Sequence, residues 1–128
     1  MTKNERFEVF FRILNQWMFL RENGVSLEEY FHIRNIKKIA IYDMGNMAGH
    51  LIAELKNSDV DICYIYDKSG REYDYGIPVA SNIEELQKID ALVVIEKDIV
   101  REIQLKISEA QMTTRVICLE QIVFEVAV

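Results

Sequence analysis

The spacing of apolar residues in the first part of the chain predicts a long helix. Between Phe7 and Arg21 these residues recur in steps of three and four, which is the period of an α-helix. Thr2 and Glu5 have the spacing of a capping box at the start of this helix, and Gly24 marks its end. The apolar positions extend beyond one stripe. We therefore expect the helix to be covered on more than one side.

A second, shorter helix is expected directly after the first. Ser26 and Glu29 again have the capping-box spacing, and the apolar positions continue through Ile33. These two helices come before the first strand-like run. They are therefore the best candidate in the sequence for a partner-binding element.

From residue 37 onward, short apolar runs alternate with helical patterns. A third capping box, Ser81 to Glu84, begins one of these helices, and residues 121–128 fit a helix or an edge strand equally well. The brief run at 77–79 contains a proline, which suits an edge strand or a strand start. The strand-like runs are residues 38–42, 60–66, 77–79, 91–95 and 115–119. The helical patterns between them contain Met47, Leu51, Ile52 and Leu55, then Ile83, Leu86 and Gln87, then Ile99, Val100, Ile103, Ile107 and Ala110.

Strands that alternate with helices over short connections predict a parallel sheet with right-handed crossovers. We expect an α/β fold of the Rossmann type, a doubly wound sheet of about five strands in the order 3-2-1-4-5. Residues 1–35 form an N-terminal helical extension in this scheme, and residues 36–128 form the Rossmann-like domain. A chain of 128 residues suits one such compact unit.

The segment after the first predicted strand resembles a phosphate-binding loop. Dinucleotide sites place G-x-G-x-x-G here, and the aligned positions read Asp43, Gly45 and Ala48, with Gly49 one residue later. The middle glycine, which lets a pyrophosphate approach the backbone, is present. Asp43 replaces the first glycine. Two like charges about 5 Å apart repel by roughly 3 kcal/mol at an effective dielectric near 20, so Asp43 opposes a phosphate in the usual position.

Asp67 closes the second predicted strand about 20 residues after this loop, where an acidic residue commonly binds ribose hydroxyls. The alternative is an ordinary turn, in which Asp67 begins the segment Lys68-Ser69-Gly70. The sequence favours neither explanation.

Residues 37–119 resemble the small Rossmann-like modules of bacterial polysaccharide biosynthesis. The resemblance rests on Ile-Ala-Ile-Tyr-Asp-Met-Gly, Tyr-Ile-Tyr-Asp, Gly-Ile-Pro-Val and Ala-Leu-Val-Val-Ile. Such modules precede capsular-polysaccharide dehydratase/epimerase domains and sugar O-acyltransferases. The resemblance implies a bound nucleotide, either NAD(H)/NADP(H) or a nucleotide sugar, at the carboxyl edge of the sheet. The residues implied to line this site are Asp43, Met44, Gly45, Asn46, Met47, Asp67, Ile95 and Glu96.

Composition limits the partners and the location. The net charge of −6 and the scattered lysines and arginines argue against nucleic acid. The most apolar early stretch, residues 7–20, is interrupted by polar residues and is too polar to span a bilayer, and no secretory signal is seen. Cys63 and Cys118 lie in strand-like runs, where free cysteine behaves as a small hydrophobic residue. We therefore expect a cytoplasmic protein with no metal site.

No catalytic set is expected. Tyr64 and Lys68 have a dehydrogenase-like spacing, but they span a strand end, where the two side chains do not converge. His32 and His50 are more consistent with solvated or capping histidines than with ligand contacts. The aromatic loop at residues 73–75 fits either a cover over a ligand or an exposed loop with aromatic anchors.

Three functions follow in order of preference. The first is a non-catalytic nucleotide-binding module linked to cell-surface carbohydrate synthesis. The second is a degenerate Rossmann domain that acts in protein interaction, and the third is a fragment of an NAD-dependent oxidoreductase. We also expect a homo-oligomer through the N-terminal helix, by way of Phe7, Phe11, Trp17 and their neighbours.

Overall fold

The computed structural model describes residues 2–42, 45–72 and 75–126 of the chain. Its centre is a five-stranded, all-parallel sheet in the order β3-β2-β1-β4-β5, which confirms the predicted Rossmann-like fold and strand order. The strands are β1 (Lys38–Tyr42), β2 (Asp61–Tyr66), β3 (Val79–Ala80), β4 (Ala91–Val94) and β5 (Arg115–Cys118).

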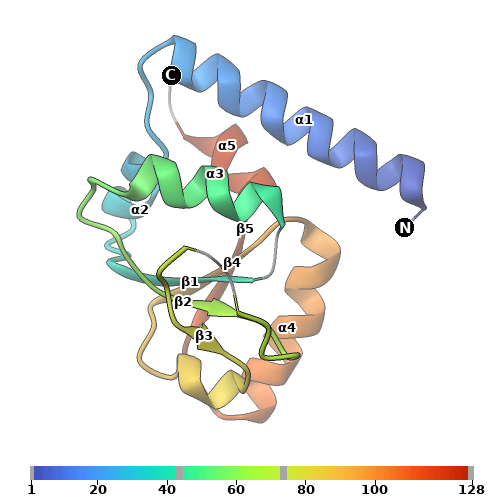
Figure 1. The fold of residues 1–128 in the computed structure, drawn as a ribbon, viewed down its shortest axis with the longest axis vertical. Helices are drawn as coiled ribbons and strands as arrows, with labels where there is room; N and C mark the ends of the chain where they lie inside the picture. Colours follow the sequence, from blue (N-terminus) through green and yellow to red (C-terminus); the bar gives the residue numbers. More distant parts are fainter. Residues whose placement is uncertain (1, 43–44, 73–74, 127–128) are drawn as a thin grey trace.

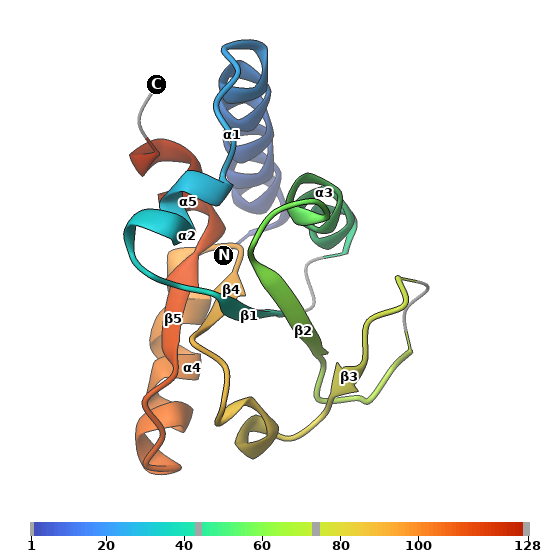
Figure 2. The same cartoon turned by 90° about the vertical axis from the view of Figure 1, so that its left-hand side faces the viewer.

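Helices cover both faces of the sheet (Figures 1 and 2). One apolar core joins the sheet to α1, α2, α3 and α5, and a second core joins the opposite face to α4 and the 3-10 helix η1. This two-sided cover explains why β4 is buried along its whole length and why its sequence is continuously apolar. The helices are α1 (Lys3–Glu22), α2 (Glu28–Ile33), α3 (Asn46–Leu55), η1 (Ile83–Leu86), α4 (Lys97–Glu109) and α5 (Leu119–Glu125).

The first helix, α1, begins where the sequence predicts, with the Thr2 hydroxyl accepting a hydrogen bond from the Glu5 N–H. It packs between α3 and α5 at one end of the molecule (Figure 2). Ile13, Trp17 and Leu20 form its buried face. The α1 helix therefore shares an apolar core with the sheet.

A carboxylate on α3 ties this helical pair to the sheet layer. One oxygen of Glu54 accepts a 2.7 Å hydrogen bond from the Trp17 indole N–H. The other accepts a 2.7 Å bond from the Leu27 backbone N–H, just before α2 begins. Because Glu54 satisfies two donors from different segments, it fixes the entry of the chain into α2.

Three local expectations are corrected. The expected Ser81–Glu84 capping box forms one residue later, between Asn82 and Glu85, because Glu85 reaches back to the backbone N–H groups at positions 81 and 82. Ser26 accepts a hydrogen bond from the Glu28 N–H, not from Glu29, so the second capping box is not formed as expected. The third strand is shorter than expected and begins only after the proline.

The ambiguous C-terminal segment is helical. After β5, α5 turns back over the layer that contains α1, and Ile122 and Val123 enter the core there. Arg12 of α1 pairs with Glu120 of α5. In the part of the chain that the structure describes, no helix is long and apolar enough to cross a membrane.

Candidate functional site

Three of the residues implied by the sequence lie at the carboxyl edge of the parallel sheet. Gly45 follows β1, Asp67 follows β2 and Glu96 follows β4. β1 pairs with both β2 and β4, with Ile41 beside Ile65 and Val93. Ligands of open α/β sheets bind at this edge, where the strand order reverses on either side of the first strand.

Gly45 is the N-cap residue of α3. Its φ of +56° lies in the region that favours glycine, and an added Cβ there would meet no heavy atom within 4 Å. Asp43 and Met44 lie outside the described residues. The position of the Asp43 carboxylate, which the sequence identifies as the main obstacle to a phosphate, is therefore not described.

The N-terminus of α3 differs from the other helix starts. Gly45 contributes no side-chain oxygen as a cap, and α3 alone among the described helices has no acidic residue in its first turn. A helix start presents free N–H groups and a partial positive charge, both of which favour an anion. Asn46 is exposed here, whereas the Met47 side chain is buried in the core. Only the backbone of Met47 is therefore suited to ligand contact.

Asp67 is buried at the end of β2, and its side chain forms a turn. Its Oδ1 accepts hydrogen bonds from the Ser69 N–H at 2.9 Å and from the Ser69 hydroxyl at 2.8 Å. The Asp67 carbonyl also accepts the Gly70 N–H at 2.9 Å. The turn that the sequence offered as an alternative is thus present. It holds the carboxylate at the edge of the sheet.

Glu96 follows β4, and its side chain is almost completely buried, at 6% exposure. Its Oε2 is buried and has no hydrogen-bond partner among the described residues. The preceding residue, Ile95, is buried in the core, and its carbonyl accepts the Glu120 N–H and the Cys118 thiol. Buried carboxylate oxygens are normally paired, so Glu96 is an unsatisfied acceptor at this edge.

The long loop after β2 returns over α3. An added Cβ at Gly49 would lie 3.3 Å from the Tyr75 hydroxyl oxygen, so Tyr75 rests against the second turn of α3. This matches the aromatic-anchor explanation of the loop more closely than the ligand-cover explanation. Tyr73 and Asp74 lie outside the described residues.

A pair of tyrosines and a pair of lysines were not expected from the sequence. Tyr42 and Tyr66 end β1 and β2, are paired in the sheet register, and contact each other edge to face at 5.7 Å between ring centroids. The side chain of Lys68 lies near that of Lys106 on α4, and the proximity of Lys68 lowers the pKa of Lys106. The only sequence signal was that two strands end in tyrosine; the lysine pair depends on residues 38 positions apart.

Other reactive residues are structural or solvated. His50 contacts the Trp17 ring edge to face at 6.2 Å, and His32 is exposed on α2. Burial raises the pKa of the Cys118 thiol, which keeps it protonated and unreactive at neutral pH. Within the described residues, no three His, Cys, Asp or Glu side chains gather to hold a metal ion.

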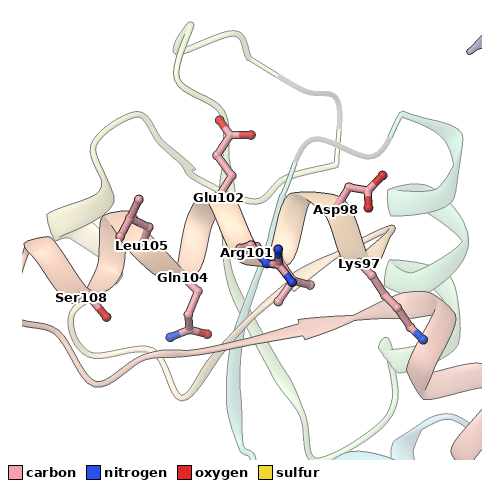
Figure 3. Close-up of a pocket in the computed structure, with 8 residues that line it drawn as sticks. Lys97, Asp98, Arg101, Glu102, Gln104, Leu105 and Ser108 are labelled. Carbon is pink, nitrogen blue, oxygen red and sulfur yellow. The ribbon is translucent and has the colours of Figure 1, made fainter. Parts of the chain in front are cut away.

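A broad hollow runs along the outer side of α4 (Figure 3). Its lining extends from Lys97 to Ser108 and belongs entirely to α4, with side chains such as Gln104 and Leu105 projecting from the one helix. Ligand sites are usually enclosed by several elements. We therefore place the candidate site at the carboxyl edge and not in this hollow.

Comparison with protein-family models, curated proteins and solved structures finds no match to this chain. The candidate site therefore rests on its own residues and geometry.

Proposed function

We propose that this protein is a non-catalytic nucleotide-binding module, with an NAD-like ligand or a nucleotide sugar at the carboxyl edge of its sheet. The proposal rests on two polar groups that follow neighbouring strands and lack a side-chain hydrogen-bond partner among the described residues. The start of α3 offers backbone donors without an acid or a side-chain cap, and the buried Glu96 offers an acceptor without a donor. A nucleotide supplies both a phosphate and hydroxyl groups.

The phosphate is proposed to lie against the first-turn N–H groups of α3, at Asn46 and Met47. Gly45 leaves space for it, because a Cβ at this position would meet nothing within 4 Å. Lys68 directly follows Asp67 after β2, so we propose that its ammonium group contributes positive charge near the same edge. This charge would offset part of the repulsion between the phosphate and the carboxylates of Asp67 and Glu96.

Hydroxyl groups of the ligand are proposed to donate to Glu96. A hydrogen bond to a carboxylate contributes about 1.5–3 kcal/mol, and more is gained where the acceptor would otherwise stay unpaired. We propose that Asp67, whose carboxylate is held by its turn with Ser69 at the end of β2, accepts hydrogen bonds from the ribose hydroxyls. The link to cell-surface carbohydrate synthesis rests on the sequence resemblance alone, and it makes nucleotide sugars the first ligands to test.

Thermal unfolding with NAD, NADP and UDP-N-acetylglucosamine tests the proposal. A ligand at about 100 times its dissociation constant adds about 2.7 kcal/mol of stability, which raises Tm by about 10 °C for a domain of this size. No rise in Tm with any nucleotide at millimolar concentration would contradict the proposal.

The variant Asn46→Glu locates the site. It adds an acid to the first turn of α3, which favours the helix dipole in the free protein but repels a phosphate. We expect ligand affinity to fall about 10- to 100-fold while the free protein keeps its stability. The matched control is Gln104→Glu, which makes the same charge change on the outer side of α4. Equal affinity in the two variants would exclude this edge as the phosphate site.

A further inference from the structure

The α1 helix has an apolar face that its own chain leaves uncovered. Phe7, Phe11, Leu14 and Met18 are 61%, 73%, 38% and 62% exposed. We call these four residues the outer stripe. In Figure 1 the helix lies across one end of the molecule, with α3 and α5 on its inner side. Phe7 and Phe11 on one soluble helix represent an unusually large exposed aromatic surface.

The inner side of α1 is already buried against the rest of the chain. Trp17, which the sequence analysis assigned to an intermolecular contact, is only 3% exposed and donates its indole N–H to Glu54. Ile13 and Leu20 are also buried in the domain core. The outer stripe is therefore separate from the buried face of α1 and remains accessible on the monomer.

We propose that the outer stripe binds the same stripe of a second copy, so that two α1 helices pair in antiparallel orientation. Steps of four, three and four residues separate Phe7, Phe11, Leu14 and Met18, and this is the heptad spacing of a two-helix seam. Such a seam pairs like with like and closes into a two-fold symmetric dimer. The proposal is independent of the nucleotide site.

Side-chain size favours the antiparallel orientation. In that orientation Phe7 lies opposite Met18 of the second copy, and Phe11 lies opposite Leu14 of the second copy. Each layer then joins one aromatic and one aliphatic side chain, which gives layers of similar volume. A parallel pair would stack Phe11 on Phe11 and leave the thinner Leu14 layer directly beside it.

Charge favours the same orientation. The seam continues to Arg21 at one end and to Asn4 at the other. A parallel pair places Arg21 against Arg21 at one end of the seam. The antiparallel pair instead brings Arg21 to Asn4 of the second copy, one turn from its Glu8, which replaces a repulsion with an attraction.

The available area is sufficient for a specific interface. A fully exposed large apolar side chain presents about 200 Å², so the outer stripe presents about 500 Å² per copy. Two copies thus bury about 1,000 Å², which is the lower limit for a specific contact. We therefore expect a dimer of moderate affinity.

Multi-angle light scattering tests the dimer. At about 50 µM we expect the mass of two chains, and we expect Phe11→Lys to reduce it to one chain, since loss of a central aromatic anchor weakens binding about 30-fold or more. The control is Leu105→Lys, which changes another exposed apolar residue, on α4, and should leave the dimer intact. A monomeric wild-type chain, or a Phe11→Lys variant that stays dimeric, would overturn the proposal.

Cross-linking tests the orientation, in a Cys63→Ser background that removes the half-exposed native thiol. A mixture of Asn4→Cys and Arg21→Cys chains should form disulfide-linked dimers on oxidation. Arg21→Cys alone should not, because the two copies of position 21 lie about 25 Å apart in an antiparallel pair. Efficient cross-linking of Arg21→Cys alone would establish a parallel pair and overturn the proposed orientation.

Discussion

Carboxylates at the two edges of the sheet differ in whether their oxygens have hydrogen-bond partners. At the amino edge, Asp90 Oδ2 accepts hydrogen bonds from the Lys37 and Lys38 backbone N–H groups, both at 2.9 Å. Glu28 of α2 accepts the Asp59 N–H there, also at 2.9 Å. At the carboxyl edge, Glu96 keeps a buried oxygen without a partner among the described residues.

This difference separates structural acids from candidate functional acids. The amino-edge carboxylates satisfy backbone donors where strands begin, so each of them stabilises the fold. An unpaired buried carboxylate has the opposite effect, because its lost hydration is not replaced. Groups that reduce stability in this way are concentrated at sites that bind ligands. The comparison therefore predicts stability changes of opposite sign when Asp90 and Glu96 are replaced.

The largest expected effect is the loss of the Asp90 carboxylate. Asp90→Ala removes two charge-assisted hydrogen bonds at the start of β1, and we expect a loss of about 2 kcal/mol at pH 7, reduced from a larger value because the residue is exposed to solvent. Urea denaturation measures this change. Asp59→Ala is the control, because Asp59 contributes its backbone, and not its side chain, to the contact with Glu28.

The effect of Asp90 should depend on pH. The backbone N–H groups of Lys38 and Lys37 lower the pKa of Asp90 in the folded protein. Its stabilisation is therefore complete above the ordinary pKa of aspartate, about 3.9, and is lost as the pH falls through the lowered folded value. The gap between wild type and Asp90→Ala should stay constant from about pH 5 to 8 and shrink below about pH 4. A gap that persists unchanged at low pH would show that the carboxylate charge is not its source.

A smaller effect of opposite sign is expected at Glu96. Glu96→Met replaces an unpaired buried carboxylate with an apolar side chain of similar length, and we expect a gain of about 1 kcal/mol. Glu54→Met is the matched control, since Glu54 satisfies both Trp17 and Leu27 and its loss should destabilise. Urea denaturation of both variants measures the sign of each change in the free energy of unfolding. A loss of stability in Glu96→Met would mean that Glu96 is a structural acid like those at the amino edge.

The fold could be predicted because its signals are local and repeated. The continuous apolar run of β4 marks a strand with both faces covered, and capping residues mark the helix starts. The exact start of η1 was missed by one residue. Ser81 and Asn82 both suit an N-cap, and Glu84 and Glu85 both suit the third position, so only the folded geometry separates the two choices.

The candidate site could be predicted only in outline. Chain order places Gly45, Asp67 and Glu96 at one edge, because the carboxyl ends of parallel strands converge. What each side chain contacts is set by distant segments, such as Lys106 of α4 beside Lys68. The same limit applied to α1. Its apolar pattern indicated two covered sides, but the burial of Trp17 depends on Glu54 of α3.

The smallest expected effect concerns the loop that rests on α3 at the carboxyl edge. Gly49→Ala should gain about 0.5–1 kcal/mol from helix propensity, but its Cβ would lie 3.3 Å from the Tyr75 hydroxyl oxygen. Tyr75 must then shift by a few tenths of an ångström, so in the wild-type background we expect only about 0.5 kcal/mol of the gain. In a Tyr75→Ala background the gain should rise to about 1 kcal/mol, and the difference between backgrounds measures the contact as a double-mutant cycle. Equal gains in both backgrounds would show that Tyr75 does not rest on α3, and the carboxyl edge would then be more open than the structure indicates.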